Sequence, residues 1–418
     1  MPEEKARPAM LGPYRVLDLT DDRGALCGKI LAEFGADVIK IERPGGDPSR
    51  NVGPFYQDTP NPERSLSWFA LNINKRGITL NLESPDGQEI FRRLASRADF
   101  VIESFTPGYL DKLGLGYSEL SKINPRIIMT SITPYGQTGP HSKYNSPDLV
   151  TMAMAGYVYI CGDSDRPPVR FSSDQSYLQG SLQAAVGTLI AHYYRLVSGE
   201  GQHVDLSMQE AMIWTLCYAP HDWYLLKQII HTREGGLWRR LGVTYRLIWP
   251  CKDGYVCYRL LMAQPGANVM NDLIASMNAE GLGENMKGID WSTLSFTEIS
   301  QDKINQWEAE IGKYFLRHTK RELHEEALRQ KNVLQPVNNA KDIVEDPQLA
   351  SRNFWVKMDH PELKTSITYP GAYFKSSETA WQKGNRAPLI GEHNQELYVK
   401  ELGFTQEELQ VLKRENVI

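Results

Sequence analysis

Short apolar segments alternate with helical ones along residues 1–135, and this alternation constrains the fold more than any other feature of the sequence. Strands and helices that alternate at such lengths favour an open, mostly parallel sheet with helices on both faces. Ligands of such Rossmann-like α/β sheets bind at the carboxyl ends of the strands. The predicted strands are Val16–Leu19, Ala36–Ile41, Gly77–Leu82, Phe100–Glu103 and Arg126–Thr130, and helices are predicted at Lys29–Phe34 and Pro85–Ala98.

The remainder of the chain divides by a change in composition. A long helical pattern runs from Tyr177 to Val197, and tryptophans, charges and amphipathic runs such as Lys303–Phe315 follow it. The tail closes with an amphipathic helix at Thr405–Val417. We therefore predict the N-terminal part of a large α/β domain over 1–222, a small α+β domain over 223–334, and a returning segment over 335–418.

Charge and cysteine content exclude several classes of protein. The 46 Lys and Arg against 51 Asp and Glu leave a net charge of −5, which gives no footprint for nucleic acid or anionic membranes. Apolar runs such as Ala184–Ala191 are shorter than the ~20 residues of a membrane span, and the N-terminus has no apolar signal region. The five cysteines form no CxxC pair. We predict a cytoplasmic protein with no metal, no nucleic-acid partner and no membrane partner.

The first strand–turn–helix–strand unit is similar to a dinucleotide-binding fold, with Glu42 at the place of a ribose-binding acid. However, Gly24-x-x-x-Gly28 is not the GxGxxG pattern that lets a pyrophosphate approach the backbone, so no NAD site is expected. The sequence also lacks a GxxxxGK[ST] loop, an HExxH pair and a GxSxG elbow.

Five longer motifs identify the sequence as similar to a known family. The chain resembles the class III CoA-transferases and their racemase relatives, and the matches keep their order from residue 14 to residue 418. The motifs are Ile30–Asp47, Asn74–Leu80, Glu103–Gly108, Gly199–Asp205 and Arg386–His393.

The resemblance implies an architecture and a ligand. It implies a large domain formed from both chain ends, a small inserted domain, two chains that interlock like links, and bound coenzyme A. Arg43 and Lys112 are cations placed where phosphate binding is favoured. Glu83 stands where relatives carry a lysine, so a phosphate contact expected there is missing. The residues implied to contact CoA are Arg43, Leu80, Asn81, Leu82, Glu83, Ser104, Phe105, Thr106 and Lys112.

The family's chemistry uses one aspartate as nucleophile toward the acyl-CoA thioester, and here that position holds Tyr177. A tyrosine hydroxyl, with a pKa of about 10, is a poor substitute for a carboxylate in this exchange. Asp174 is the nearest acid and the candidate catalytic residue. The alternative is that Asp174, which follows Ser172 and Ser173, only caps the helix that begins there.

The resemblance therefore implies a subunit of a CoA-transferase that moves CoA from an acyl-CoA, such as succinyl-CoA, to a carboxylic acid. Some family members pair an aspartate-bearing subunit with a related degenerate one, and this sequence is similar to the degenerate type; such a pair acts on (R)-benzylsuccinate in anaerobic toluene degradation. The expected assembly is a heterotetramer with an aspartate-bearing homologue, or else an interlocked homodimer. The alternative is a non-catalytic CoA-binding or structural subunit. An acyl-CoA racemase is disfavoured because Pro147, which cannot move protons, stands where racemases carry a histidine.

Overall fold

The computed structural model describes residues 9–230, 232–240, 242–264, 266–379, 381 and 384–418. These residues form two compact units. The first unit comprises 1–158, 170–228 and 350–418, and the second comprises 159–169 and 229–349. The larger unit is therefore discontinuous in sequence, and the chain enters and leaves it more than once.

A six-stranded sheet forms the centre of the first unit, and all of its strand pairs are parallel. The predicted parallel sheet is thus confirmed. Its spatial order is β3-β2-β1-β4-β5-β6, so the order reverses between β1 and β4. The strands are β1 (Arg15–Leu19), β2 (Asp37–Glu42), β3 (Arg76–Thr79), β4 (Phe100–Glu103), β5 (Ile128–Thr133) and β6 (His203–Ser207).

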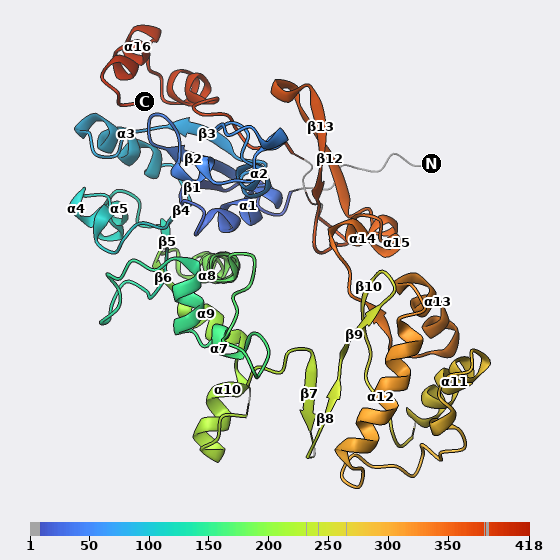
Figure 1. Cartoon of the computed structure of the whole chain (residues 1–418). Coiled ribbons are helices and arrows are strands. Elements are labelled where there is room, and N and C mark those ends of the chain that lie inside the picture. The colour runs from blue at the N-terminus through green and yellow to red at the C-terminus, as the bar shows by residue number, and fades with distance from the viewer. Residues whose placement is uncertain (1–8, 231, 241, 265, 380, 382–383) are drawn as a thin grey trace. The chain divides into compact units, whose positions relative to one another are not determined.

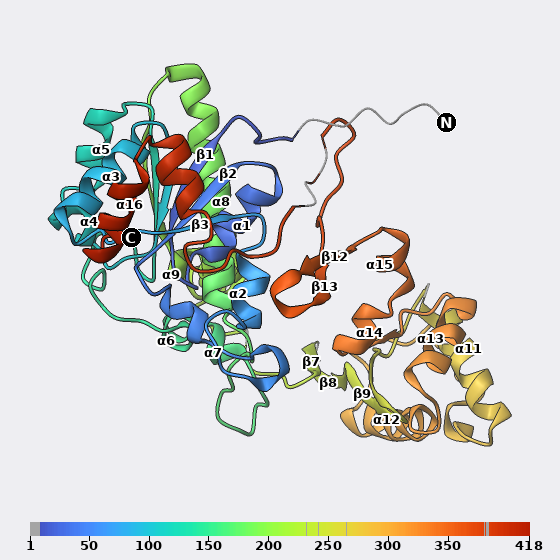
Figure 2. The same ribbon diagram turned by 90° about the horizontal axis from the view of Figure 1, so that it is seen from above.

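Side chains that alternate along these strands fill one hydrophobic core on each face of the sheet. Leu17 and Val101 face a core shared with α3 (Pro85–Ala95) and α5 (Tyr117–Ile123). The C-terminal helix α16 (Gln406–Arg414) lies on the same face as α3 (Figure 2). Val16 and Phe100 face the opposite core, which α1 (Ala25–Glu33) and α8 (Gln175–Ser198) cover. This arrangement leaves the carboxyl ends of the strands uncovered by either layer.

The other elements of the first unit are shorter and lie in the loops and in the returning segment. They are α2 (Leu66–Leu71), α4 (Tyr109–Lys112), α6 (Asp148–Met154), α9 (Met208–Thr215), α10 (Tyr218–His221), β12 (Trp355–His360), β13 (Thr365–Pro370), and the π-helical segments η3 (Asp222–Leu226) and η6 (Gln395–Glu401). Helices α7 (Tyr157–Ile160) and α15 (Pro347–Ser351) stand where the chain passes between units.

The second unit is a small α+β body (Figure 1). It has its own core of large apolar side chains, including Trp249, Trp291 and Trp307. Its strands pair in antiparallel fashion. Its elements are β7 (Leu237–Arg240), β8 (Val243–Arg246), β9 (Ile248–Cys251), β10 (Gly254–Cys257), α11 (Gly266–Ala279), α12 (Gln301–Phe315), α13 (Lys320–Gln330), β11 (Gln335–Pro336) and α14 (Ala340–Val344).

The returning segment completes the large unit by covering the outer edge of β3. Gly77 donates its N–H to His393 Nδ1 at 3.1 Å, and the N–H of His393 donates to the Gly77 carbonyl at 2.9 Å. Thr79 donates its N–H to Asn394 Oδ1 at 2.9 Å, and the Tyr398 hydroxyl donates to the Thr79 carbonyl. Residues beyond 390 therefore satisfy the free edge of the sheet.

Candidate active site

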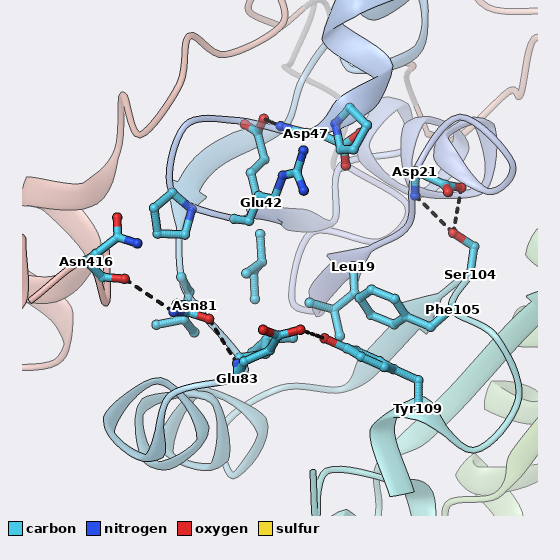
Figure 3. A pocket seen from close by; sticks show the side chains of 16 residues that line it. Leu19, Asp21, Glu42, Asp47, Asn81, Glu83, Ser104, Phe105, Tyr109 and Asn416 are labelled. Atoms are coloured by element: carbon cyan, nitrogen blue, oxygen red, sulfur yellow. Dashed lines mark hydrogen bonds between the residues drawn. The ribbon is translucent and has the colours of Figure 1, made fainter. Parts of the chain in front are cut away.

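A cavity of about 410 Å³ lies at the carboxyl ends of β1, β2, β3 and β4, where the strand order reverses (Figure 3). This is the place at which open α/β sheets bind ligands. We call it the strand-end cavity. It is lined by Leu19, Asp21, Ile41, Glu42, Arg43, Pro44, Asp47, Pro48, Leu80, Asn81, Leu82, Glu83, Ser104, Phe105, Tyr109 and Asn416.

The acid at the ribose-binding place of the sequence pattern has a different role. Glu42 is fully buried and lies 2.8 Å from Arg50 Nη2, in a bidentate pair whose guanidinium stacks over the Trp68 ring. A paired and buried carboxylate of this kind holds the turn after β2 together. Glu42 is therefore not available to a ribose hydroxyl.

Two further acids of the strand-end cavity are also neutralised by cations. Asp47 lies 3.4 Å from the buried ammonium of Lys40. Burial alone would raise the pKa of Asp47, but the charge of Lys40 and the hydrogen bonds from Ser49 together outweigh it and hold the pKa below its usual range. Asp21 accepts from Arg23 Nε at 2.9 Å and from the Ser104 hydroxyl at 2.8 Å. These pairs fix the turns that form the cavity wall.

The structure brings together most of the residues that the resemblance implies for CoA. Arg43, the Leu80–Glu83 turn and the Ser104–Phe105 turn all line the strand-end cavity. Thr106 is exposed and lines a neighbouring cavity instead. Lys112 is exposed at the end of α4 and lines neither of these two cavities.

The neighbouring cavity, of about 470 Å³, contains a buried glutamate at the end of β4. Glu103 is 4% exposed, and its Oε2 accepts the N–H of Phe105 at 2.7 Å. Burial raises the pKa of Glu103 to about 7. On the adjacent strands, Ser131 Oγ lies 2.9 Å from His203 Nε2. Because its Oε2 accepts the Phe105 N–H, Glu103 supports the turn that separates the two cavities.

The N-terminus of α8 is capped by a residue from another helix. Asp174 stands at the N-cap position, but within the described part of the chain its side chain makes no capping hydrogen bond. The N–H and the hydroxyl of Ser176 instead donate to Asp148 Oδ1, each at 2.7 Å. Asp174 thus stands at the N-cap position, as the alternative expected, but its side chain does not cap the helix. The carboxyl group of Asp174 is exposed and takes no part in capping the helix.

Tyr177, at the position of the family nucleophile, lines a cavity of about 340 Å³ together with Asp174. We call this the Tyr177 cavity. The hydroxyl oxygen of Tyr177 accepts the N–H of Asp148 at 3.2 Å. Burial, and then the negative charge of Asp22, raise the pKa of Tyr177 to about 12. The hydroxyl therefore stays protonated near neutral pH and is not an anionic nucleophile.

Asp22 is a second carboxyl group of the Tyr177 cavity that the sequence did not single out. The pKa of Asp22 is raised to about 6. Burial is the main cause, the negative charge of Asp21 is the next, and the charge of Asp174 adds to the effect. The signal was present, because Asp21-Asp22-Arg23 follows β1 directly at the ligand-binding end of the sheet. The sequence alone does not show that Asp22 is partly buried beside other acids, so it was not predicted as a site residue.

Among the described residues, no group of three or more His, Cys, Asp or Glu side chains is arranged to hold a metal ion. None of the helices within the described ranges has the length and apolar content to cross a membrane.

Comparisons with known proteins agree with the fold. Residues 11–394 match the model of CoA-transferase family III. The chain is 37% identical over 406 residues to succinyl-CoA:(R)-benzylsuccinate CoA-transferase subunit BbsE of Thauera aromatica, a match that covers 96% of each chain. It is 32% identical over 400 residues to succinyl-CoA:mesaconate CoA-transferase of Haloarcula marismortui, covering 93% of this chain and 95% of the relative.

A solved structure shows the same fold. A CaiB/BaiF family protein from Brucella suis superposes with a TM-score of 0.80 at 24% identity, covering 94% of this chain and 99% of the other. The chain thus has the α/β fold of that CaiB/BaiF protein. The chain belongs to CoA-transferase family III, as its sequence motifs indicated.

Proposed function

We propose that this chain is a subunit of a CoA-transferase that moves CoA from succinyl-CoA to a carboxylic acid, with an aryl-substituted succinate such as (R)-benzylsuccinate as acceptor. The similarity to the Thauera aromatica subunit along 96% of the chain is the observation that carries this proposal. Other relatives also carry succinyl-CoA in their names, which supports this donor.

The strand-end cavity supports a role in holding the nucleotide end of CoA. Arg43 offers a cation for phosphate beside the turn after β2. Phe105 and Tyr109 have ring centroids 4.7 Å apart and offer an aromatic surface for a base. Asn81 and Ser104 add polar groups for orientation.

The proposed transfer passes CoA from one acid to the other by way of a carboxylate of the enzyme. A carboxylate oxygen attacks the thioester carbonyl, and the C–S bond breaks to give a mixed anhydride and the CoA thiolate. The thiolate then attacks the anhydride at the carbonyl carbon that belongs to the enzyme's carboxyl group. This step forms a thioester between that carboxyl group and CoA, and it releases succinate. The acceptor acid reverses the same two steps. Water must stay outside, because it would hydrolyse both intermediates.

Tyr177 favours a non-catalytic role for this chain within such an assembly. Its hydroxyl is held by the Asp148 N–H, and its raised pKa keeps it protonated. We therefore infer that a homologous aspartate-bearing subunit supplies the nucleophile. The proposed assembly is a heterotetramer of the two, with an interlocked homodimer as the alternative.

Asp174 as the nucleophile is the second candidate, and one observation favours it. Because Asp148 caps α8, the Asp174 carboxyl group is left uncommitted and lines the same cavity as Tyr177. A nucleophile of this kind would have to come within about 3–3.5 Å of the thioester carbonyl.

Mass spectrometry decides between the two candidates. The purified chain, together with any subunit that co-purifies, is incubated with succinyl-CoA, digested, and searched for a peptide that carries CoA. We expect no adduct on the peptide containing Asp174, and an Asp174→Asn variant with nearly unchanged CoA transfer. Asp165→Asn, at an exposed aspartate of the second unit, is the matched control.

The opposite results are equally clear. An adduct on Asp174, lost together with activity in Asp174→Asn, would assign the nucleophile to this chain. Absence of CoA exchange in every assembled form, with any of several dicarboxylic acceptors, would contradict the transferase proposal itself.

A further inference from the structure

One acidic side chain of the strand-end cavity differs from the rest in its electrostatic surroundings. Asp21, Glu42 and Asp47 each have a cation partner, as described above. For Glu83, the part of the chain that the structure describes provides no ion pair. Its Oε1 accepts the hydroxyl of Tyr109 at 3.2 Å, which is a neutral donor (Figure 3). Within the described residues, Glu83 is therefore an exposed carboxylate of the cavity wall with no cation beside it.

The positive charge of the same cavity is limited to one residue. Among the described residues that line it, Arg43 is the one cation. Its Nε donates to the Gly46 carbonyl at 3.3 Å, which leaves the rest of the exposed guanidinium for a ligand. CoA carries a diphosphate and a separate 3′-phosphate on its ribose. Arg43 can serve one of these groups, whereas the side of the cavity that contains Glu83 repels the other.

The hydrogen bond from Tyr109 fixes where Glu83 meets a ligand. Tyr109 and Phe105 form the aromatic surface proposed for the base, and the Tyr109 hydroxyl holds the Glu83 carboxylate at the edge of that surface. Burial, and then the charge of Glu83, raise the pKa of Tyr109, so the hydroxyl remains a donor at neutral pH. A ribose attached to a base on this surface would meet the carboxylate.

In nucleotide sites, an acidic side chain beside the ribose and a cationic one select different ligands. A carboxylate accepts hydrogen bonds from free ribose hydroxyls, whereas a phosphorylated ribose needs a cation in its place. Building on the proposed nucleotide role of this cavity, we propose that Glu83 makes it selective for an adenine nucleotide end whose ribose hydroxyls are free. The 3′-phosphate of CoA is disfavoured there.

This selectivity has a consequence for the assembly. If the strand-end cavity of this chain rejects the 3′-phosphate, the CoA that reacts is held in the corresponding cavity of the homologous subunit. The cavity described here then binds dephospho-CoA or ADP better than it binds CoA, although all three share the diphosphate that Arg43 contacts.

Isothermal titration calorimetry of the purified protein, in whatever assembly it forms, tests the proposal with CoA, 3′-dephospho-CoA and ADP. We expect dephospho-CoA to bind at this chain's cavity roughly fivefold more tightly than CoA, because a like charge about 4 Å from an exposed carboxylate costs about 1 kcal/mol. Glu83→Lys should reverse the order. Glu83→Gln, the milder change, should bring the two affinities close together.

Glu89→Lys is the matched control, because it makes the same charge change at an exposed position of α3, with 66% of the side chain exposed. It should keep the ratio of the wild type. Because a homologous subunit in the assembly would bind CoA in the wild type and the variants alike, the comparison with the Glu83 variants decides, and the proposal is overturned if neither Glu83→Gln nor Glu83→Lys changes the ratio of the CoA and dephospho-CoA affinities. That result leaves the transferase proposal standing, since CoA still binds. Failure of all three ligands to bind, with no CoA transfer by the assembly, would remove both proposals.

Discussion

The Asp148 carboxylate lies 2.7 Å from the backbone nitrogen of Ser176 and 2.7 Å from its hydroxyl, and so caps α8 from the start of α6. Both residues are buried. The bond joins a loop after β5 to the longest helix of the large unit. It also frees Asp174, the residue that local sequence would choose as the cap.

The capping role predicts a clear difference in stability between two aspartates. Asp148→Ala should lower the free energy of unfolding by about 1–3 kcal/mol, because it leaves buried donors of Ser176 without an acceptor. Asp148→Asn keeps an acceptor and should cost less. Asp174→Ala, at the N-cap position itself, should change stability by less than about 0.5 kcal/mol. Chemical denaturation followed by circular dichroism measures all three, and an equal loss for the two alanine variants would contradict the assignment.

A second prediction concerns ligand binding in the strand-end cavity. Arg43→Ala should weaken binding of dephospho-CoA by roughly 1–3 kcal/mol, because a charge-assisted phosphate contact is lost. Arg329→Ala, at an exposed arginine of the second unit, is the control. Unchanged affinity in a folded Arg43→Ala protein, measured by calorimetry, would move the phosphate site elsewhere.

A third prediction follows from the raised pKa of Glu103. Its pKa is about 7 in the folded chain against 4.5 for an unperturbed glutamate, since burial disfavours the charged form. The folded state therefore binds the proton more tightly than the unfolded state, and stability falls as the pH rises from about 4.5 to 7. Glu103→Gln removes this dependence. Relative to that variant, the wild type should lose about 3 kcal/mol of unfolding free energy between pH 5 and pH 8. Glu119→Gln, at an exposed glutamate, should give a curve parallel to the wild type; parallel curves for Glu103→Gln as well would disprove the idea.

A fourth prediction concerns assembly. Large apolar side chains of α8, α9 and η3 stand in solvent, with Val197, Trp214, Tyr224 and Leu225 between 77% and 80% exposed. Apolar surface of this extent is typical of an interface. We expect the chain to elute from size-exclusion chromatography with light scattering as a dimer or with a homologous subunit. Trp214→Lys should shift it toward smaller species, and a well-behaved monomer of the wild type would refute the expected assembly.

The sequence predicted the sheet well because its strands are short apolar runs bounded by turns. Phe100–Glu103 was predicted with the bounds of β4. The strand predicted over Gly77–Leu82 is shorter, since β3 ends at Thr79 and the next residues bend to line the strand-end cavity. The boundaries of a strand at a binding site depend on contacts with distant segments, such as Asn81 with Val417, that local pattern does not contain.

Helix α1 shows a different limit of sequence reasoning. It was predicted from Lys29, but it begins at Ala25 and contains Gly28. A side chain at Gly28 would collide with the carboxylate of Asp18, which pairs at 2.8 Å with Lys75 Nζ; both residues are buried. The glycine therefore makes room for an ion pair between residues far apart in sequence. Without knowledge of that pair, Gly28 reads as part of a turn.

The candidate site also has a part that the sequence predicted and a part that it did not. The family resemblance implied that Arg43 and the Leu80–Glu83 segment contact one ligand, and the structure places both at one cavity. The pairing of Glu42 with Arg50 and the raised pKa of Asp22 depend on burial and on neighbouring charges, which only the folded chain establishes.

The covering of β3 by residues beyond 390 has a consequence for synthesis of the protein. Until those residues leave the ribosome, Gly77 and Thr79 have no partners for the outer groups of the strand. An uncovered strand edge is a template for pairing with other chains. Nascent chains halted in the second unit should therefore aggregate through this edge and depend on chaperones. A fragment that ends before His393 should be insoluble, although it contains every strand of the sheet.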